Sequence, residues 1–402
     1  MRDRPGLSRR AVAMPASPIR RLAPLAEAAR RAGKRVWPLN IGQPDIRAPQ
    51  EILSRLAGFD APNVPYGPSE GLPEFRATLS RYYARHGLSV SPEELFVTTG
   101  GSEALLFVLA AIADPGNEVL VFEPFYTNYS GFAALVGVHT VPVTTHAEDG
   151  YHLPERRAIE ARLSERTRAI VLCSPNNPTG TVYRDDELER VAEICRARDL
   201  FLVADEVYRE FTYDGRKHRS ALTLEGLDGR VVLVDSLSKR VSLCGARVGW
   251  IATRHRPLLD AVLKFGQARL CPPTLGQYVG IGLDQVGDEY VREVVAEYQR
   301  RRDLVYTELE RMPGVTVRRP EGAFYLCAKL PVDDAQRFAE YLLRDFALDG
   351  ETVMLAPADG FYATPGLGCD EARIAYVVEE RGLARAMRIV AAALAAYPGR
   401  TG

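Results

Sequence analysis

Six short apolar runs in the first 260 residues show no alternation of polar and apolar side chains. A strand with one face in water alternates, so continuous apolar runs are typical of strands buried on both faces of a parallel or mixed sheet. Helical patterns lie between several of them, such as Ser102–Ala113 and Asp185–Arg198. The sequence therefore predicts an α/β fold over roughly residues 60–285. The runs are Leu95–Thr98, Glu118–Phe122, Ala169–Cys173, Phe201–Ala204, Val231–Val234 and Val248–Ala252.

The last third of the chain follows a different pattern. Tyr290–Met312 is a long polar helix pattern, and the residues beyond it mix short strand and helix patterns up to an Ala-rich closing helix around Gly382–Tyr397. This mixture predicts a smaller α+β domain. The N-terminal residues hold too little apolar sequence for a core of their own, so we expect them to pack on that domain. The predicted parts are an N-terminal segment of residues 1–45, a large α/β domain of residues 46–290 and a small domain of residues 291–402.

Charge and hydropathy argue against two broad classes of function. The 402 residues carry 51 Lys and Arg against 52 Asp and Glu, a net charge of −1, so a broadly basic nucleic-acid surface is not expected. The longest purely apolar run, Ala104–Ala113, is too short for a bilayer, which takes about 20 residues. The Arg-rich N-terminus has no apolar signal core, whether the protein starts at Met1 or at Met14. We expect a cytoplasmic protein without nucleic-acid or membrane partners.

The sequence carries no motif for a metal or a nucleotide. Its six cysteines lie far apart with no C-x-x-C pair, and its six histidines have no metal-ligand spacing. It has no G-x-G-x-x-G and no G-x-x-x-x-G-K, which disfavours a dinucleotide site and a P-loop. We therefore predict no metal and neither of these nucleotide sites.

Polar side chains follow the predicted strands instead. Lys239, one of only five lysines, lies in Ser-Leu-Ser-Lys just after the fifth run; Asp205 and Tyr208 follow the fourth, and Asn177 follows the third. The first run leads through Thr-Thr-Gly-Gly-Ser into a helix whose free N–H groups form an anion site, and Arg247 lies eight residues beyond Lys239. Ligands of open α/β sheets bind at the carboxyl ends of the strands, so we expect these groups to converge.

Pyridoxal phosphate needs this set of groups. Its phosphate suits a helix N-terminus with serine and arginine, its ring nitrogen needs a carboxylate, and its aldehyde needs a lysine. Arginine cannot replace that lysine, because a guanidinium group is not deprotonated in proteins. The residues therefore predict pyridoxal 5'-phosphate as the cofactor.

The order and spacing of these motifs resemble the class I aminotransferases, which are pyridoxal-phosphate enzymes of fold type I. The resemblance runs from Leu39-Asn-Ile-Gly-Gln-Pro-Asp45 to Arg373. It implies a large α/β domain with a mixed, mostly parallel seven-stranded sheet and a small α+β domain. Its most specific motifs are Asn177-Pro-Thr-Gly, Asp205-Glu-x-Tyr208 and Ser-x-Ser-Lys239 with Arg247 eight residues on. Two further runs resemble a bacterial subgroup described as aspartate aminotransferases, Gln267-Ala-Arg-Leu-Cys-Pro-Pro273 and Ala356-Pro-Ala-Asp-Gly-Phe-Tyr362.

The resemblance implies roles for residues around the cofactor. Lys239 forms the covalent bond to the aldehyde and, once free, moves the proton of the substrate Cα. Asp205 pairs with the ring nitrogen, while Tyr208 and Asn177 hydrogen-bond the ring's 3-oxygen. Tyr126 stacks on the ring. The phosphate is held by Gly101, Ser102, Ser236 and Arg247.

Other implied residues contact the substrate or a second subunit. Arg373 clamps the α-carboxylate of the substrate, assisted by Asn177 and the backbone of Gly42. Tyr66 matches a tyrosine that reaches the phosphate bound by the partner subunit. The resemblance therefore implies a homodimer with shared active sites.

One position departs from the family pattern. In an aspartate-using branch a lysine follows the Gly-Gly of the phosphate loop and reads the distal carboxylate, whereas this chain has Ser102 there. Family members bring the segments of Arg269 and Arg20 to the pocket, so these two are the candidates for that role. If Arg269 is the reader, Arg269→Ala should selectively weaken dicarboxylic substrates.

The resemblance implies ping-pong transamination between an L-amino acid and a 2-oxo acid. Aspartate is the first donor to consider, and 2-oxoglutarate the acceptor. The alternatives are another donor with the same cofactor (aromatic, methionine or kynurenine-type) and a β-lyase. A more distant alternative is a regulatory protein that binds the cofactor without catalysis.

Overall fold

The apolar runs form one seven-stranded sheet in the computed structural model, which describes residues 6–60 and 62–401. The strand order is β2-β8-β7-β6-β5-β3-β4, in which β8 is antiparallel to both its neighbours and the other pairs are parallel. This confirms the expected mixed, mostly parallel sheet. The strands are β2 (Leu95–Thr98), β3 (Glu118–Glu123), β4 (His139–Thr144), β5 (Thr167–Cys173), β6 (Phe201–Asp205), β7 (Val231–Ser236) and β8 (Gly249–Ala252).

Helices cover both faces of this sheet, which explains why its strands do not alternate. Val119 and Val121 of β3 lie in one buried cluster with side chains of α5 (Gly100–Ile112), and Leu120 and Phe122 lie in another with side chains of α8 (Asp185–Arg198). Both sets of β3 side chains are thus removed from water. The other helices of this body are α3 (Gln50–Ala57), α4 (Pro73–Arg85), α6 (Asn128–Val136), α7 (Arg156–Glu160), α9 (Leu237–Arg240), α10 (Arg256–Arg269) and α11 (Thr274–Gly280).

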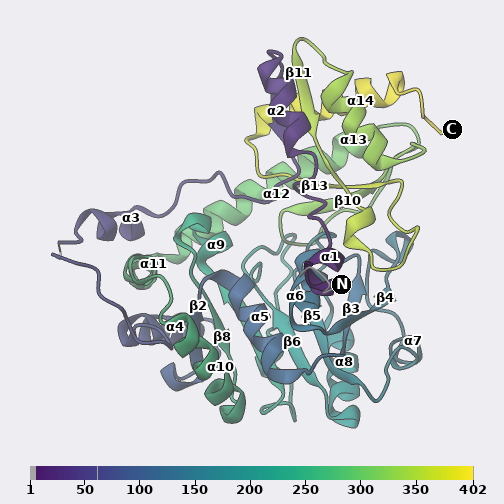
Figure 1. Cartoon of the computed structure of the whole chain (residues 1–402). Coiled ribbons are helices and arrows are strands. Elements are labelled where there is room, and N and C mark those ends of the chain that lie inside the picture. Colours follow the sequence, from purple (N-terminus) through teal and green to yellow (C-terminus); the bar gives the residue numbers. More distant parts are fainter. Residues whose placement is uncertain (1–5, 61, 402) are drawn as a thin grey trace.

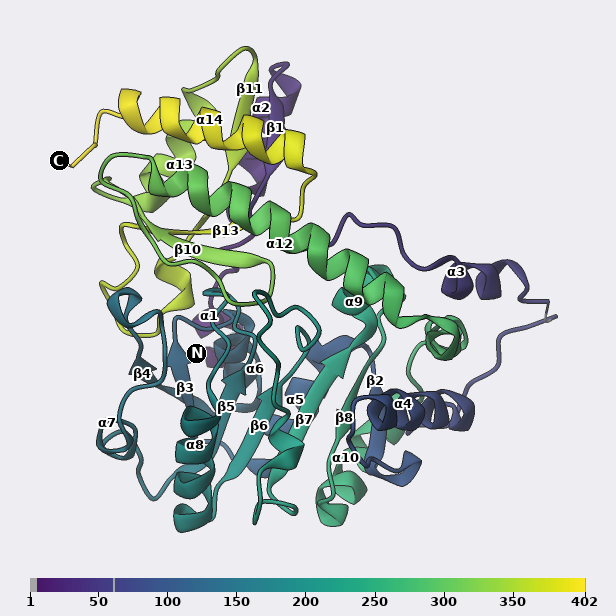
Figure 2. The ribbon, with the colours of Figure 1, turned by 180° about the vertical axis from the view of Figure 1, so that it is seen from behind.

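A second, smaller body lies beyond the long helix α12 (Asp288–Glu310), which runs between the two in Figure 2. Its central strand β10 (Tyr325–Lys329) is antiparallel to β13 (Glu371–Ala375) and β9 (Thr316–Val317), and β12 (Ala356–Pro357) pairs with β13. Its helices are α13 (Ala335–Arg344) and α14 (Glu380–Ala396).

Residues from the N-terminus complete the second body. β1 (Arg35–Pro38) pairs in parallel with β11 (Glu351–Met354), and α2 (Ala23–Arg31) packs on α13. The short α1 (Arg9–Ala13) lies instead beside α6 of the large body. The domain boundaries at residues 45 and 290 stay a prediction.

Extended chain runs on either side of α3 (Figure 1), while α3 itself packs on α11 of the large body through the buried Ile52. We call residues 50–60 and 62–66 the arm. Leu56, Val64 and Tyr66 on this arm are 52%, 50% and 79% exposed. The arm therefore carries apolar side chains away from the chain's own core. Within the described residues no helix combines the length and the hydropathy needed to cross a bilayer.

Candidate active site

A cavity of about 730 Å³ opens at the carboxyl ends of β5, β6 and β7, between the two bodies. The sequence-predicted residues line it, with the exception of Tyr66 and Arg269. Both bodies contribute, because Arg373 on β13 and Tyr325 on β10 belong to the second body, whereas most of the other lining residues come from the large body. The predicted residues in its lining are Gly42, Gly101, Ser102, Tyr126, Asn177, Asp205, Tyr208, Ser236, Lys239, Arg247 and Arg373.

The first turn of α5 forms a cradle of backbone N–H groups at one side of the cavity. Gly100 has a φ of +72°, and a Cβ built on it would lie 2.5 Å from Nη2 of Arg247. A Cβ on Gly249 would lie 2.4 Å from the carbonyl carbon of Gly100. Glycine is therefore required at both positions for the backbone to approach this closely. Ser102 and Ser236 line the same part of the cavity, and the combination suits a phosphate.

Lys239 follows β7 on the short helix α9 and points into the cavity. Its Nζ donates a hydrogen bond to the carbonyl oxygen of Gly42 at 2.7 Å. A Cβ on Gly42 would lie 1.6 Å from the hydroxyl oxygen of Tyr325, so only glycine fits beside that phenol. The amine is thus held at the centre of the site by a backbone group rather than by a carboxylate.

Asp205 is a buried carboxylate at the end of β6 that borders the cavity. The hydroxyl of Tyr129 donates to its Oδ2 at 2.7 Å, and the backbone N–H of Val207 donates to its Oδ1 at 3.4 Å. Burial raises the pKa of Asp205 to about 6. A buried carboxylate is costly without a cation beside it, and the protonated ring nitrogen of pyridoxal phosphate is such a cation.

Arg373 lies almost fully buried on β13, where two acceptors fix its guanidinium group. Its Nη1 donates to Oδ1 of Asn177 at 3.1 Å, and its Nη2 donates to the carbonyl oxygen of Asn40. Its Nε has no hydrogen-bond partner among the described residues. Because the Asn177 oxygen accepts from Arg373, the Asn177 NH₂ group is left for another acceptor. An anionic substrate group can use the unpaired donor of Arg373.

Arg269 is not in the lining of this cavity, and its expected contact with the substrate stays a prediction. Its Nε pairs with Glu103 at 3.3 Å, and its Nη2 donates to the carbonyl oxygen of Val97 at 3.3 Å. These partners hold the side chain against the first turn of α5 and the end of β2. Arg20, the other candidate, lines the cavity. Tyr66 lies on the exposed arm, away from this cavity.

The sequence did not single out two phenols of the site. Tyr129 on α6 contacts Asp205, and Tyr325 on β10 lies beside Tyr208. Both occur in segments where a buried aromatic side chain is the ordinary expectation, so no signal in the sequence separates them from the core.

The lysine, the buried carboxylate and the glycine cradle together fit pyridoxal phosphate. Comparison with known proteins agrees, since residues 34–387 match the model of the family "Aminotransferase class I and II". The chain belongs to this family. It is therefore a pyridoxal-phosphate-dependent transferase of fold type I whose substrates are amino acids and 2-oxo acids, as the resemblance implied.

Named relatives of this aminotransferase cover nearly all of it. The aspartate/prephenate aminotransferase of Thermus thermophilus is 32% identical over 394 residues, which are 95% of this chain and 97% of that protein. A structure of the Thermus thermophilus aspartate aminotransferase with maleate has a TM-score of 0.86 at 31% identity and covers 97% of this chain and all of that one. An alanine aminotransferase from Pyrococcus furiosus has a TM-score of 0.88 at 28% identity, covering 96% and 99%.

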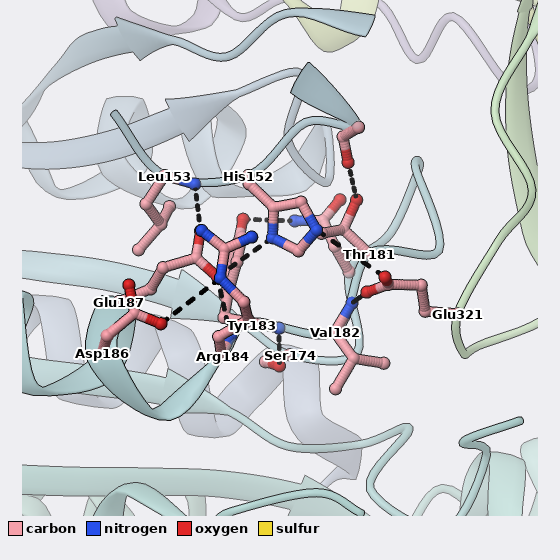
Figure 3. Close-up of polar contacts among 12 residues, drawn as sticks. His152, Leu153, Ser174, Thr181, Val182, Tyr183, Arg184, Asp186, Glu187 and Glu321 are labelled. Atoms are coloured by element: carbon pink, nitrogen blue, oxygen red, sulfur yellow. Dashed lines mark hydrogen bonds and ion pairs between the residues drawn. The ribbon is translucent and has the colours of Figure 1, made fainter. Parts of the chain in front are cut away.

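The loop that carries Asn177 is supported by a polar cluster around His152 (Figure 3). Nδ1 of His152 lies 2.9 Å from Glu187 of α8, and its Nε2 lies 3.7 Å from Glu321 of the second body. The backbone N–H of Val182, just beyond the loop, donates to Glu321 at 3.1 Å. His152 therefore joins both bodies behind the aminotransferase site.

Replacing His152 with glutamine should destabilise the protein most at mildly acidic pH. Hydrogen bonds that the His152 ring donates to Glu187 and then to Glu321 raise the pKa of His152 to about 9, against roughly 6.5 when unfolded. A raised pKa stabilises the fold below pH 6.5, and this contribution is lost as the pH rises through 9. We expect the free energy of unfolding to fall by about 1–2 kcal/mol at pH 6 and to be unchanged above pH 9. Urea unfolding at both pH values measures the difference.

The charged neighbours and a matched variant make this pH dependence specific to His152. Arg184 pairs with Glu187 and Arg216 with Glu321, and both arginines stay charged over this range. His146, exposed in the same loop, is the control, because His146→Gln removes an imidazole without a buried partner. If His152→Gln lowered the free energy of unfolding equally at pH 6 and pH 10, the pairing of His152 with Glu187 and Glu321 would be contradicted.

Proposed function

We propose that this aminotransferase takes the amino group of a dicarboxylic L-amino acid, aspartate first, and passes it to 2-oxoglutarate by ping-pong transamination. The observation that carries the proposal is a third arginine in the cavity, beside Arg373 and the Arg247 expected at the phosphate. Arg373 is buried at one part of the lining, and Arg20 lines the same cavity as an exposed side chain. Aspartate and 2-oxoglutarate each carry two carboxylates, which two guanidinium groups can bind.

The backbone around Arg20 is fixed against the second body. The side-chain NH₂ of Asn40 donates to the carbonyl oxygen of Ile19 at 2.9 Å, and both terminal nitrogens of Arg21 donate to Asp359. Arg20 itself makes no ion pair with any residue that the structure describes. The segment therefore holds an unpaired guanidinium group at the cavity.

We infer the following division of work among the residues of the cavity. Pyridoxal phosphate supplies an aldehyde for the amino group and a ring that draws electrons from the substrate Cα. Lys239 holds the cofactor and then takes the proton from the substrate Cα. Asp205 stabilises positive charge on the ring nitrogen, and Tyr208 and Asn177 donate hydrogen bonds to the 3-oxygen. Arg373 orients the α-carboxylate.

The exposed arm supports the proposal of a homodimer. Tyr66 is 79% exposed and lies outside the lining of this chain's own cavity, so it can reach a phosphate only in a second copy. Exposed apolar side chains on the same arm, Leu56 and Val64, favour such a contact.

The test is a set of single-donor reactions with Arg20→Gln. Loss of a charge-assisted contact should lower kcat/KM for aspartate by about 10- to 100-fold and leave alanine within about twofold. Arg31→Gln, which changes an exposed arginine of α2, is the matched control. Each half-reaction is run without an acceptor, and the absorbance of the bound cofactor measures its rate. Equal losses for aspartate and alanine would remove Arg20 from the proposal.

The donor series also separates the alternatives. A structural neighbour is named alanine aminotransferase, so preference for alanine over aspartate in the unmodified enzyme would replace the dicarboxylic proposal. If only an aromatic amino acid or methionine removed the absorbance of the bound cofactor, the donor would belong to that class instead. Release of ammonia and pyruvate without an acceptor would identify a β-lyase.

A further inference from the structure

Tyr325 brings a phenol from the second body into direct contact with Tyr208 of the large body. The two hydroxyl oxygens lie 2.9 Å apart, and the rings meet edge to face with centroids 5.6 Å apart. Both side chains are buried, and both line the cavity. The contact is therefore a hydrogen bond between the two bodies at the site itself.

The neighbouring acceptors set the direction of this hydrogen bond. The carbonyl oxygen of Gly42 already accepts from Lys239 at 2.7 Å, and it lies 3.5 Å from the Tyr325 hydroxyl. Either hydroxyl can donate across the 2.9 Å contact. With the 3-oxygen of the cofactor as the acceptor for Tyr208, as proposed above, the Tyr208 oxygen can only accept here, so Tyr325 donates to it. Burial, and next the neighbouring Tyr325, raise the pKa of Tyr208 well above its ordinary value. Tyr208 therefore keeps its own hydrogen at neutral pH and can donate it into the cavity.

We propose that Tyr325 is a positioning residue, which orients the Tyr208 hydroxyl as a donor to the 3-oxygen of the bound cofactor. The inference rests on the role proposed above for Tyr208. A hydroxyl that accepts one hydrogen bond donates a stronger one. Tyr325 thus increases the stabilisation of negative charge on the ring oxygen, and this lowers the pH at which the bound chromophore titrates.

The position of Tyr325 depends on the strands that present Arg373. β10 and β13 are paired so that Tyr325 lies opposite Ala375 and Cys327 lies opposite Arg373. The guanidinium carbon of Arg373 lies 4.6 Å from the centre of the Tyr325 ring. Arg373 and Tyr325 are therefore held next to each other by one pair of strands.

Tyr325→Phe keeps the aromatic ring and its contact with the Arg373 guanidinium group. The variant replaces none of the other ionisable side chains around the pair. These groups come from every element that borders the pair in the cavity. They are Tyr126 after β3, Cys173 on β5, Asp205 on β6, Lys239 on α9 and Arg373 on β13.

The experiment is a spectrophotometric pH titration of the cofactor-loaded enzyme. Tyr325→Phe should raise the titration midpoint by about 0.3–0.5 pH unit, and Tyr208→Phe should raise it further. The double variant should titrate as Tyr208→Phe does, because Tyr325 acts through that hydroxyl. Tyr376→Phe, which removes a buried phenol of the second body outside the cavity, should leave the midpoint unchanged.

The outcomes distinguish this inference from the proposed function. A shift for Tyr208→Phe without one for Tyr325→Phe overturns the positioning role alone. Additive shifts in the double variant also overturn it, since Tyr325 would then act independently. No shift for Tyr208→Phe overturns the role of Tyr208 and the inference with it.

Discussion

Replacing Lys239 with alanine is expected to lower the rate of amino-group transfer by about 10⁴-fold or more. Among the described residues, Lys239 is the only lysine that lines the cavity. Its Nζ donates a hydrogen bond to the carbonyl oxygen of Gly42. In the proposed mechanism, its removal takes away both the covalent hold on the cofactor and the base for the Cα proton. Single-turnover absorbance of the loaded enzyme with excess donor measures the rate.

Two variants separate this chemistry from a loss of charge. Lys239→Arg keeps a cation, but its guanidinium group is not deprotonated, so it should be as inactive as alanine. Lys264→Ala removes an exposed lysine of α10 and should match the unmodified enzyme. Borohydride reduction followed by mass spectrometry should place the cofactor on Lys239 in the unmodified protein. Substantial turnover by Lys239→Arg would contradict its role as the base.

The convergence of the site was predictable because it follows from strand order. Asn177, Asp205 and Lys239 each follow an apolar run, and parallel strands bring their carboxyl ends to one edge of the sheet. The glycine cradle was predictable for the same reason, since it joins β2 to α5. The seventh strand, β4, carried a weaker signal, because threonine, proline and histidine interrupt its apolar residues.

Contacts between the two bodies were not predictable from residue patterns, and Arg373 was expected at the site only through the family resemblance. Arg373 and Tyr325 reach the cavity only because β10 and β13 pair on the second body and face the large sheet across it. Tyr325 has no motif of its own. Arg269 was expected at the pocket through the resemblance alone, and its contacts with Glu103 and the carbonyl oxygen of Val97 could not be read from the sequence. Side-chain partners of this kind depend on packing, which spacing along the chain does not encode.

Asp205→Asn is expected to lower kcat/KM by about 10²- to 10³-fold, because it leaves the ring nitrogen of the cofactor without a buried counter-charge. Tyr129→Phe is the matched control, because it removes the 2.7 Å hydrogen bond to Asp205 but keeps the carboxylate. It should lower kcat/KM by less than about tenfold. Steady-state rates with a fixed donor and acceptor measure both. Activity of Asp205→Asn within tenfold of the unmodified enzyme would contradict the pairing.

The same substitution should change stability in opposite directions with and without cofactor. Burial raises the pKa of Asp205 to about 6 in the cofactor-free fold, against roughly 3.9 when unfolded. A raised pKa means that the folded state loses stability as the pH rises through 6, so the cofactor-free Asp205→Asn protein should be about 1–3 kcal/mol more stable at pH 8 and no more stable at pH 4. With the cofactor bound, the carboxylate faces a cation and the variant should be the less stable protein. Urea unfolding at pH 8, with and without pyridoxal phosphate, measures the reversal, and a variant that is more stable in both states would show that Asp205 does not pair with the cofactor.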